Sequence, residues 1–129
     1  MGSSAMLFTL LAYAVLNYAV AAAGDMDLSL LPASLPSANG GRCLDGSMAG
    51  YYYRQGSADT FVIYLHGGGA CYDEASCVKR AQTALGSSKH WSQTITGGGK
   101  SAGDALLSTD CSTNPAFCNA TAVWVPYCT

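Results

Sequence analysis

The chain has 129 residues, of which 6 are Lys or Arg and 8 are Asp or Glu, so its formal net charge is −2. This balance excludes the strongly basic surface by which proteins bind nucleic acids or anionic membranes. Charged residues make up only 11% of the sequence, against roughly 25% in an average soluble domain. An apolar segment and a region rich in glycine and small polar residues both contribute to this low value.

An apolar segment without charges occupies residues 6–23. It ends in Ala19-Val20-Ala21 and Ala21-Ala22-Ala23, which both fit the A-x-A pattern of a signal-peptidase site, and the chain then becomes polar. Residues 1–23 are therefore predicted to be a secretory signal peptide, cleaved after Ala21 or Ala23. An uncleaved N-terminal anchor is the alternative.

Six cysteines follow this segment, at positions 43, 71, 77, 111, 118 and 128. An even number of cysteines in a secreted chain predicts disulfides but leaves their pairing open. Zinc is the alternative, yet the chain has no C-x-x-C pair and only 2 histidines, so we expect no metal. Asn119 begins an Asn-Ala-Thr glycosylation sequon, which is consistent with secretion.

Residues 24–41 are rich in Pro, Ser and Gly towards their end and are predicted to be an extended linker, followed by one folded domain over 42–129. Gly50–Arg54 and Thr60–Leu65 contain the aromatic and β-branched residues of strands, with a turn between them. The second of these strands is apolar throughout, which predicts a strand buried on both faces of its sheet.

A helix is predicted over residues 74–85, because apolar residues recur there at helical spacing, with Asp73 as its N-cap and Gly86 as its stop. No element is predicted over 87–118. Residues 122–128 predict a last buried strand, and the order strand, helix, strand indicates a parallel pair. These elements do not complete a layered domain, so we expect part of an α/β fold with an uncovered sheet face and edge.

The most informative motif is His66-Gly67-Gly68-Gly69, which lies between a predicted strand and the helix. In esterases of the α/β-hydrolase fold, an HGGG loop at this place supplies backbone N–H groups to the oxyanion hole. One such donor lowers the reaction barrier by about 2.7–4 kcal/mol. The alternative is a tight glycine turn without a catalytic role.

One string, Gly99-Lys100-Ser101-Ala102-Gly103, matches the G-x-S-x-G motif of a serine nucleophile. No buried strand leads into it, and it precedes the last predicted strand, so Ser101 is not predicted to be the nucleophile. A triad could be assembled on paper from Ser101, His90 and Asp104, but a triad is defined by geometry. A P-loop is excluded because Thr94 stands where its first glycine belongs.

Five segments resemble, in order, the N-terminal part of the pectin acetylesterase family, which includes the Notum carboxylesterases. They are Cys43-Leu-Asp-Gly-Ser47 with Gly50-Tyr-Tyr52, Phe61-Val-Ile-Tyr-Leu-His-Gly-Gly-Gly69, Cys71-Tyr-Asp-Glu-Ala-Ser-Cys77, Gly86-Ser-Ser-Lys-His-Trp91 and Val123-Trp-Val-Pro-Tyr-Cys128. Together they span about residues 42–128. The ordered combination is far more specific than any one of its motifs.

The resemblance implies an α/β-hydrolase-like fold with a Ser-Asp-His triad and no cofactor, and places oxyanion donors at Gly68 and Gly69. It also implies three disulfides, which are Cys43–Cys128, Cys71–Cys77 and, for the remaining pair, Cys111–Cys118. His66 and Ala70 differ from the Glu and Trp that plant members usually have there. The family's nucleophile, acid and base lie beyond Thr129, so we expect a truncated chain that is inactive alone.

The leading hypothesis is a secreted, monomeric carboxylesterase of the cell wall that hydrolyses acetyl esters of pectin, with no nucleic-acid partner and no membrane attachment after signal cleavage. One alternative is a Notum-like enzyme that removes a fatty acyl group from a protein. The other is a secreted, disulfide-rich fragment or binding protein without catalysis.

Overall fold

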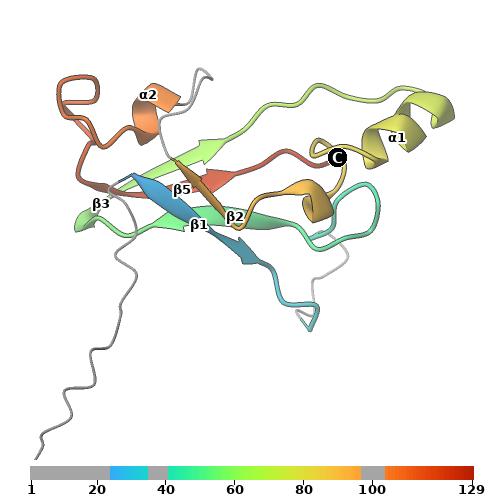
Figure 1. The fold of residues 1–129 in the computed structure, drawn as a ribbon, viewed down its shortest axis with the longest axis horizontal. Coiled ribbons are helices and arrows are strands. Elements are labelled where there is room, and N and C mark those ends of the chain that lie inside the picture. The colour runs from blue at the N-terminus through green and yellow to red at the C-terminus, as the bar shows by residue number, and fades with distance from the viewer. Residues whose placement is uncertain (1–23, 35–40, 97–103) are drawn as a thin grey trace, which may run out of the picture.

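The computed structural model of the chain describes residues 24–34, 41–96 and 104–129, and its centre is a five-stranded sheet (Figure 1). The strands are β1 (Asp25–Leu30), β2 (Gly50–Arg54), β3 (Ser57–Leu65), β4 (Thr94–Thr96) and β5 (Ala120–Val125). The helices are α1 (Glu74–Ala81), the 3-10 helix η1 (Ser88–His90) and α2 (Asp104–Leu107). The predicted signal peptide lies outside the described residues.

The strands lie side by side in the order β3-β5-β2-β1-β4. β3 and β5 are parallel, whereas β2 runs antiparallel to β5, and β1 runs antiparallel to both β2 and β4. The predicted order of a strand, a helix and a second strand parallel to the first is therefore confirmed by β3, α1 and β5. Pro126 follows the end of β5, where its missing N–H removes no ladder bond.

β3 is not buried on both faces, so that prediction is wrong. Phe61, Ile63 and Leu65 are 59%, 66% and 71% exposed, while Val62 and Tyr64 between them pack against the core. β3 is one of the two edge strands of the sheet, and the other described residues leave one of its faces open. An apolar run indicates a strand with two apolar faces, but it does not say whether both are covered.

The prediction of a linker over 24–41 is wrong for Asp25–Leu30, which form β1. This strand pairs with β2 on one side and with β4 on the other. Met26 of β1 is fully buried in the core, which also contains Tyr52, Leu107 and Ala122. The sheet therefore begins directly after the predicted cleavage sites, and residues 35–40 lie outside the described part of the chain.

Helix α1 begins as predicted and ends earlier than predicted. The Asp73 carboxylate accepts a hydrogen bond from the Ser76 backbone N–H at 2.7 Å, and the Ser76 hydroxyl closes a capping box. The helix ends at Ala81 instead of Leu85, because the Thr83 hydroxyl donates to the Arg80 carbonyl oxygen at 2.8 Å and a turn follows. No residue of α1 is buried.

The region 87–118, where no element was predicted, contains η1, β4 and α2. Leu107 of α2 is only 2% exposed and joins the core.

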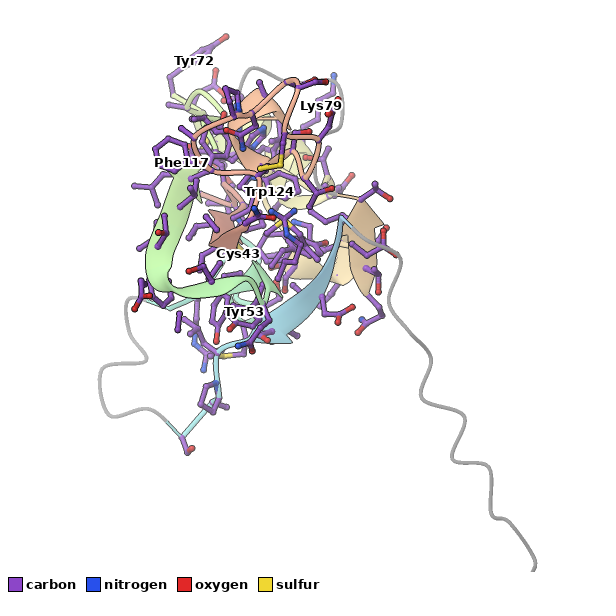
Figure 2. The ribbon with its side chains drawn as sticks, turned by 90° about the vertical axis from the view of Figure 1, so that its left-hand side faces the viewer. Cys43, Tyr53, Tyr72, Lys79, Phe117 and Trp124 are labelled. Atoms are coloured by element: carbon purple, nitrogen blue, oxygen red, sulfur yellow. A yellow bond between two sulfur atoms is a disulfide. The ribbon has the colours of Figure 1, made fainter. Side chains whose placement is uncertain are left out.

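Figure 2 shows Trp124 of β5 within the body of the molecule and Tyr72, which is 90% exposed, at its outer limit. In the described ranges, no helix is long and apolar enough to span a bilayer.

Three disulfides link the elements, and they join the pairs that the resemblance implies. Cys43–Cys128 connects the segment before β2 to the end of the chain, Cys71–Cys77 closes the loop into α1, and Cys111–Cys118 lies between α2 and β5. These three bonds include all 6 cysteines of the sequence.

Candidate active site

The glycine loop leaves the sheet at the carboxyl end of β3. The His66 backbone N–H donates to the Val125 carbonyl oxygen at 2.9 Å, which extends the β3–β5 pairing by one residue. The His66 ring packs edge-on against Trp124 and Tyr64, with ring centroids 5.4 and 6.5 Å apart. His66 therefore anchors the start of the loop.

The backbone N–H groups of the loop have no partner within the described chain. From Gly67 to Cys71, no amide donates a hydrogen bond to another described residue, although the flanking amides of His66 and Tyr72 do. Consecutive unpaired N–H groups after a strand form the kind of concavity that binds an anion. The loop can thus offer several donors to one developing negative charge.

Two of the three glycines cannot be replaced without strain. A Cβ atom on Gly68 would lie 2.0 Å from Cδ1 of the Tyr127 ring, and Gly69 has a φ of +71°. At Gly67, a Cβ atom would meet nothing within 4 Å. Packing therefore requires glycine at 68 and backbone conformation requires it at 69, which are the two predicted donor positions.

Two residues that sequence analysis did not single out touch this loop. Nη1 of Arg80, from the last turn of α1, donates to the Gly68 carbonyl oxygen at 2.8 Å. The Arg80 guanidinium also lies 5.7 Å from the centre of the Tyr127 ring. Figure 1 shows the C-terminal end of the chain beside α1, which brings these two residues to the loop.

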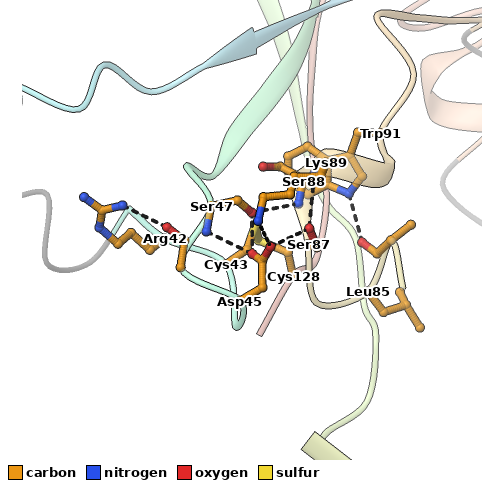
Figure 3. Close-up of a disulfide and its surroundings, with 12 residues drawn as sticks. Arg42, Cys43, Asp45, Ser47, Leu85, Ser87, Ser88, Lys89, Trp91 and Cys128 are labelled. Carbon is orange, nitrogen blue, oxygen red and sulfur yellow. Dashed lines mark hydrogen bonds and ion pairs between the residues drawn. A yellow bond between two sulfur atoms is a disulfide. The ribbon is translucent and has the colours of Figure 1, made fainter. Parts of the chain in front are cut away.

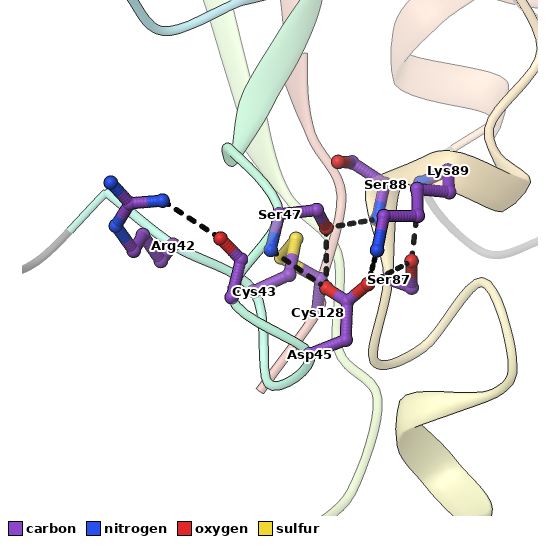
Figure 4. A network of polar contacts seen from close by, with 9 residues as sticks. Arg42, Cys43, Asp45, Ser47, Ser87, Ser88, Lys89 and Cys128 are labelled. Atoms are coloured by element: carbon purple, nitrogen blue, oxygen red, sulfur yellow. Dashed lines mark hydrogen bonds and ion pairs between the residues drawn. A yellow bond between two sulfur atoms is a disulfide. The ribbon is translucent and has the colours of Figure 1, made fainter. Parts of the chain in front are cut away.

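The disulfide Cys43–Cys128 fixes the chain directly after Tyr127 (Figure 3). Beside it, the Leu44 N–H donates to the Cys128 carbonyl oxygen at 2.8 Å. Asp45 connects this corner to η1, because its carboxylate accepts from the Ser87 hydroxyl at 2.8 Å and lies 3.0 Å from Nζ of Lys89 (Figure 4).

The Asp45 carboxylate is held in its charged form. Hydrogen bonds from the hydroxyl and then the backbone N–H of Ser47 lower its pKa well below the ordinary value, and bonds from Ser87 and Lys89 act in the same direction. The Ser47 hydroxyl in turn accepts from the Ser88 N–H at 3.1 Å. The contacts of Asp45 and the Cys43–Cys128 disulfide together hold the C-terminal segment that carries Tyr127.

No catalytic triad is assembled in the described part of the chain. Ser101 lies outside the described residues, so its pairing with His90 and Asp104 stays untested. Neither His66 nor His90 has a ring hydrogen bond to a described Ser or Asp side chain. In the described ranges there is also no cluster of three His, Cys, Asp or Glu residues able to hold a metal ion.

The depressions in the described surface include one at the start of β3 and β5 and one beside the glycine loop. One, of about 590 Å³, is lined by Arg54, Gly56 and Asn119 at the end where β3 and β5 begin. Another, of about 330 Å³, is lined by Ala70, Lys79 and Arg80 beside the glycine loop. The sequon residue Asn119 is exposed and lines the first of these depressions.

A glycine loop between a parallel edge strand and a helix, on a sheet continued by antiparallel strands, defines part of an α/β-hydrolase-like fold. Comparison with protein families and solved structures agrees with this class. Residues 19–129 match the family Pectinacetylesterase, and the chain belongs to that family.

Its relatives include two kinds of esterase. Pectin acetylesterase 5 of Arabidopsis thaliana is 40% identical over 98 residues, 74% of this chain and 22% of that protein. The mouse palmitoleoyl-protein carboxylesterase NOTUM is 38% identical over 89 residues, 67% of this chain and 16% of that protein. A crystal structure of the Wnt deacylase Notum from Drosophila superposes with a TM-score of 0.65 at 32% identity, covering 81% of this chain and 28% of that one. The chain thus spans roughly a fifth of these relatives' length.

Proposed function

We propose that this chain supplies the first strands and the oxyanion loop of a secreted serine carboxylesterase that hydrolyses acetyl esters of pectin. The observation that carries the proposal is the row of amides from Gly67 to Cys71, at the carboxyl end of β3, which have no hydrogen-bond partner among the described residues. Membership of the pectinacetylesterase family supports the same chemistry.

In the proposed reaction, a serine hydroxyl attacks the acetyl carbonyl carbon while a histidine accepts its proton. The carbonyl oxygen becomes an oxyanion, and the N–H groups of Gly68 and Gly69 donate to it. Each donor stabilises the transition state by about 2.7–4 kcal/mol. The intermediate collapses, the sugar alcohol leaves with the proton from histidine, and water then hydrolyses the acetyl-enzyme to acetate.

The nucleophile is proposed to come from a segment that lies beside β3. It must reach the same carbonyl group as the glycine loop, and the outer edge of β3 has no strand partner among the described residues. The exposed row of Phe61, Ile63 and Leu65 beside this edge suits coverage by further chain. His66 is not proposed as the base, because its ring packs between aromatic residues.

Secretion to the cell wall is proposed on the signal-like segment and the three disulfides, because disulfides persist in oxidising compartments. A glycan on Asn119 is part of this proposal. Asn119 precedes β5, whereas the glycine loop follows β3, and these strands are parallel. A strand of about six residues separates the two ends by roughly 20 Å, so the glycan would leave the loop accessible.

The test is to purify the protein from its native source and to measure acetate release from acetylated pectin. A fluorophosphonate probe, which labels activated serines, would then be located by peptide mass spectrometry. We expect acetate release and a labelled serine other than Ser101, and a Ser101→Ala variant that is still labelled. Absence of both turnover and labelling would instead support the non-catalytic alternative.

A lipid-ester hydrolase is the second candidate, because mouse NOTUM is almost as similar in sequence as the plant enzyme, at 38% against 40% identity. The same purified protein would be given a palmitoleoylated peptide beside acetylated pectin. Preferential release of the fatty acid would favour this candidate, and preferential release of acetate would favour pectin.

A further inference from the structure

We propose that Arg80 and Tyr127 are positioning residues that aim the backbone N–H groups of the glycine loop at the reacting carbonyl oxygen. This inference rests on the proposed esterase function. Neither residue is proposed to touch the substrate. Both act on Gly68, Arg80 by a hydrogen bond to its carbonyl oxygen and Tyr127 by contact with its Cα.

Arg80 sets the direction of the Gly69 N–H. The carbonyl of Gly68 and the N–H of Gly69 belong to one peptide unit, and the described chain contains no cis peptide bond. In a trans peptide these two groups point in opposite directions. The hydrogen bond of 2.8 Å from Arg80 to the Gly68 oxygen therefore turns the Gly69 N–H away from α1. The charge of the guanidinium also strengthens this bond.

Tyr127 sets the position of the same peptide. Its ring fills the space that a Cβ atom on Gly68 would need, so Gly68 lies directly against the ring. The next residue, Cys128, is bound to Cys43, which prevents the ring from moving away with a loose C-terminal segment. The Arg80 guanidinium at 5.7 Å from the ring centre joins the two residues into one clamp.

The clamp orders the middle of a loop that His66 and the Cys71–Cys77 disulfide hold only at its two ends. Glycine loses more conformational entropy on ordering than any other residue, and the amides of residues 67–71 have no partner within the described chain. Donors stabilise an oxyanion best when they are oriented before the reaction begins. The contacts with Arg80 and Tyr127 supply that order from outside the loop.

The first experiment compares Arg80→Met, Arg80→Lys and Arg42→Met in the full native chain. Arg42→Met is the matched control, because the exposed Arg42 also donates from its guanidinium to a backbone carbonyl oxygen, that of Gly46, which lies outside the glycine loop. For Arg80→Met we expect kcat on p-nitrophenyl acetate to fall about 10- to 100-fold, as for a slightly misplaced catalytic group, with KM changed less than about twofold. Arg80→Lys should restore part of kcat, and Arg42→Met should match the wild type.

A second readout does not depend on activity. We expect the Gly69 amide to change its NMR chemical shift and exchange faster with solvent in Arg80→Met, but not in Arg42→Met. An active Arg80→Met enzyme with unchanged kcat and an unchanged Gly69 amide would overturn the positioning role alone. A wild-type protein without activity would overturn the proposed function, while the Gly69 amide would still report whether Arg80 orders the loop.

The Tyr127 contact is tested by a double-mutant cycle on the same readouts. Gly68→Ala alone should displace the loop, because its Cβ atom would meet the Tyr127 ring. In a Tyr127→Ala background the same substitution should lower kcat and disturb the Gly69 amide much less, because the ring that the Cβ atom would meet is absent. Equal effects in both backgrounds would overturn the contact as the origin of the glycine requirement.

Discussion

Asp45 brings together the segment before β2, the turn after α1 and η1. Its backbone N–H donates to the Gly86 carbonyl oxygen at 3.1 Å, and its carboxylate accepts hydrogen bonds from Ser47 and Ser87. These donors favour the charged carboxylate, so the pKa of Asp45 is lowered, chiefly by Ser47. Protonation of the Asp45 carboxylate should therefore weaken the contacts that join the segment before β2 to η1.

This coupling predicts a pH dependence of stability. Because the folded-state pKa is lowered, the contribution of Asp45 is complete above its unfolded pKa of about 4 and is lost as pH falls from there towards the folded pKa. Asp45→Asn should therefore be less stable at pH 7 and lose less further stability between about pH 4 and pH 2. Urea unfolding at a series of pH values measures this.

The control for that series is Asp59→Asn, which removes an exposed carboxylate from β3 whose side chain has no hydrogen-bond partner among the described residues. It should follow the wild-type curve. Hydrogen bonds from Ser76 and Ser112 also lower the pKa values of Asp73 and Asp110, so Asp45→Asn should retain part of the acid sensitivity. A wild-type acid slope in Asp45→Asn would contradict the assignment.

At the scale of the elements, substitutions in β1 test whether the residues after the predicted cleavage sites contribute to the stability of the fold. Met26 is fully buried between β2 and β4, whereas Leu30 in the same strand is 49% exposed. Met26→Ala should lower the free energy of unfolding by about 2–4 kcal/mol, and Leu30→Ala by less than about 1 kcal/mol. Similar small effects in urea unfolding would return this segment to the role of a linker.

The exposed face of β3 leads to a second prediction for the elements. Ile63→Lys removes an apolar side chain that is 66% exposed, so the 129-residue chain should self-associate less and keep its stability. Val62→Lys, one residue away, would place a charge against the core and should prevent folding. Size-exclusion chromatography and circular dichroism distinguish these outcomes. Unchanged self-association in Ile63→Lys would show that another surface is responsible.

Short sequence patterns predicted the elements whose defining residues lie close together in the sequence. β2 and the N-terminus of α1 carry their own aromatic or capping residues and form where predicted, whereas the apolar strand predicted over 122–128 forms as β5 over Ala120–Val125. β1 and β4 are held by pairing with each other, through partners such as Met26 and Ile95 that are far apart in sequence. No short window contains that information.

The candidate site divides in the same way. Gly68 and Gly69 stand in a motif whose role can be recognised, but Arg80 and Tyr127 are 12 and 59 residues from Gly68. Arg80 belongs to no motif, and the segment Val123–Cys128 that contains Tyr127 predicts no contact with the loop. Their contacts with the loop depend on how α1 and the C-terminal segment are placed, and the placement of the C-terminal segment depends on Cys43–Cys128. Sequence could therefore indicate the donors but not the residues that orient them.

For the whole molecule, the Cys43–Cys128 bond is predicted to be the most important covalent restraint. It joins residues 85 positions apart, whereas Cys71–Cys77 joins residues 6 positions apart. Because a crosslink restricts the unfolded chain more when its loop is longer, Cys43→Ala with Cys128→Ala should cost about 4–5 kcal/mol, and Cys71→Ala with Cys77→Ala about 2 kcal/mol. Urea unfolding of both double variants gives the comparison.

The long-range disulfide has a second expected effect, because Cys128 directly follows Tyr127. Its loss should release the Tyr127 ring from Gly68 and speed hydrogen exchange at the Gly69 amide under conditions where the fold persists. Loss of Cys111–Cys118, which lies between α2 and β5, should leave that amide unchanged. If both variants change the Gly69 amide equally, the effect comes from a general loss of stability. If only the Cys43–Cys128 variant changes it, this disulfide holds the clamp of Arg80 and Tyr127 that orients the glycine loop.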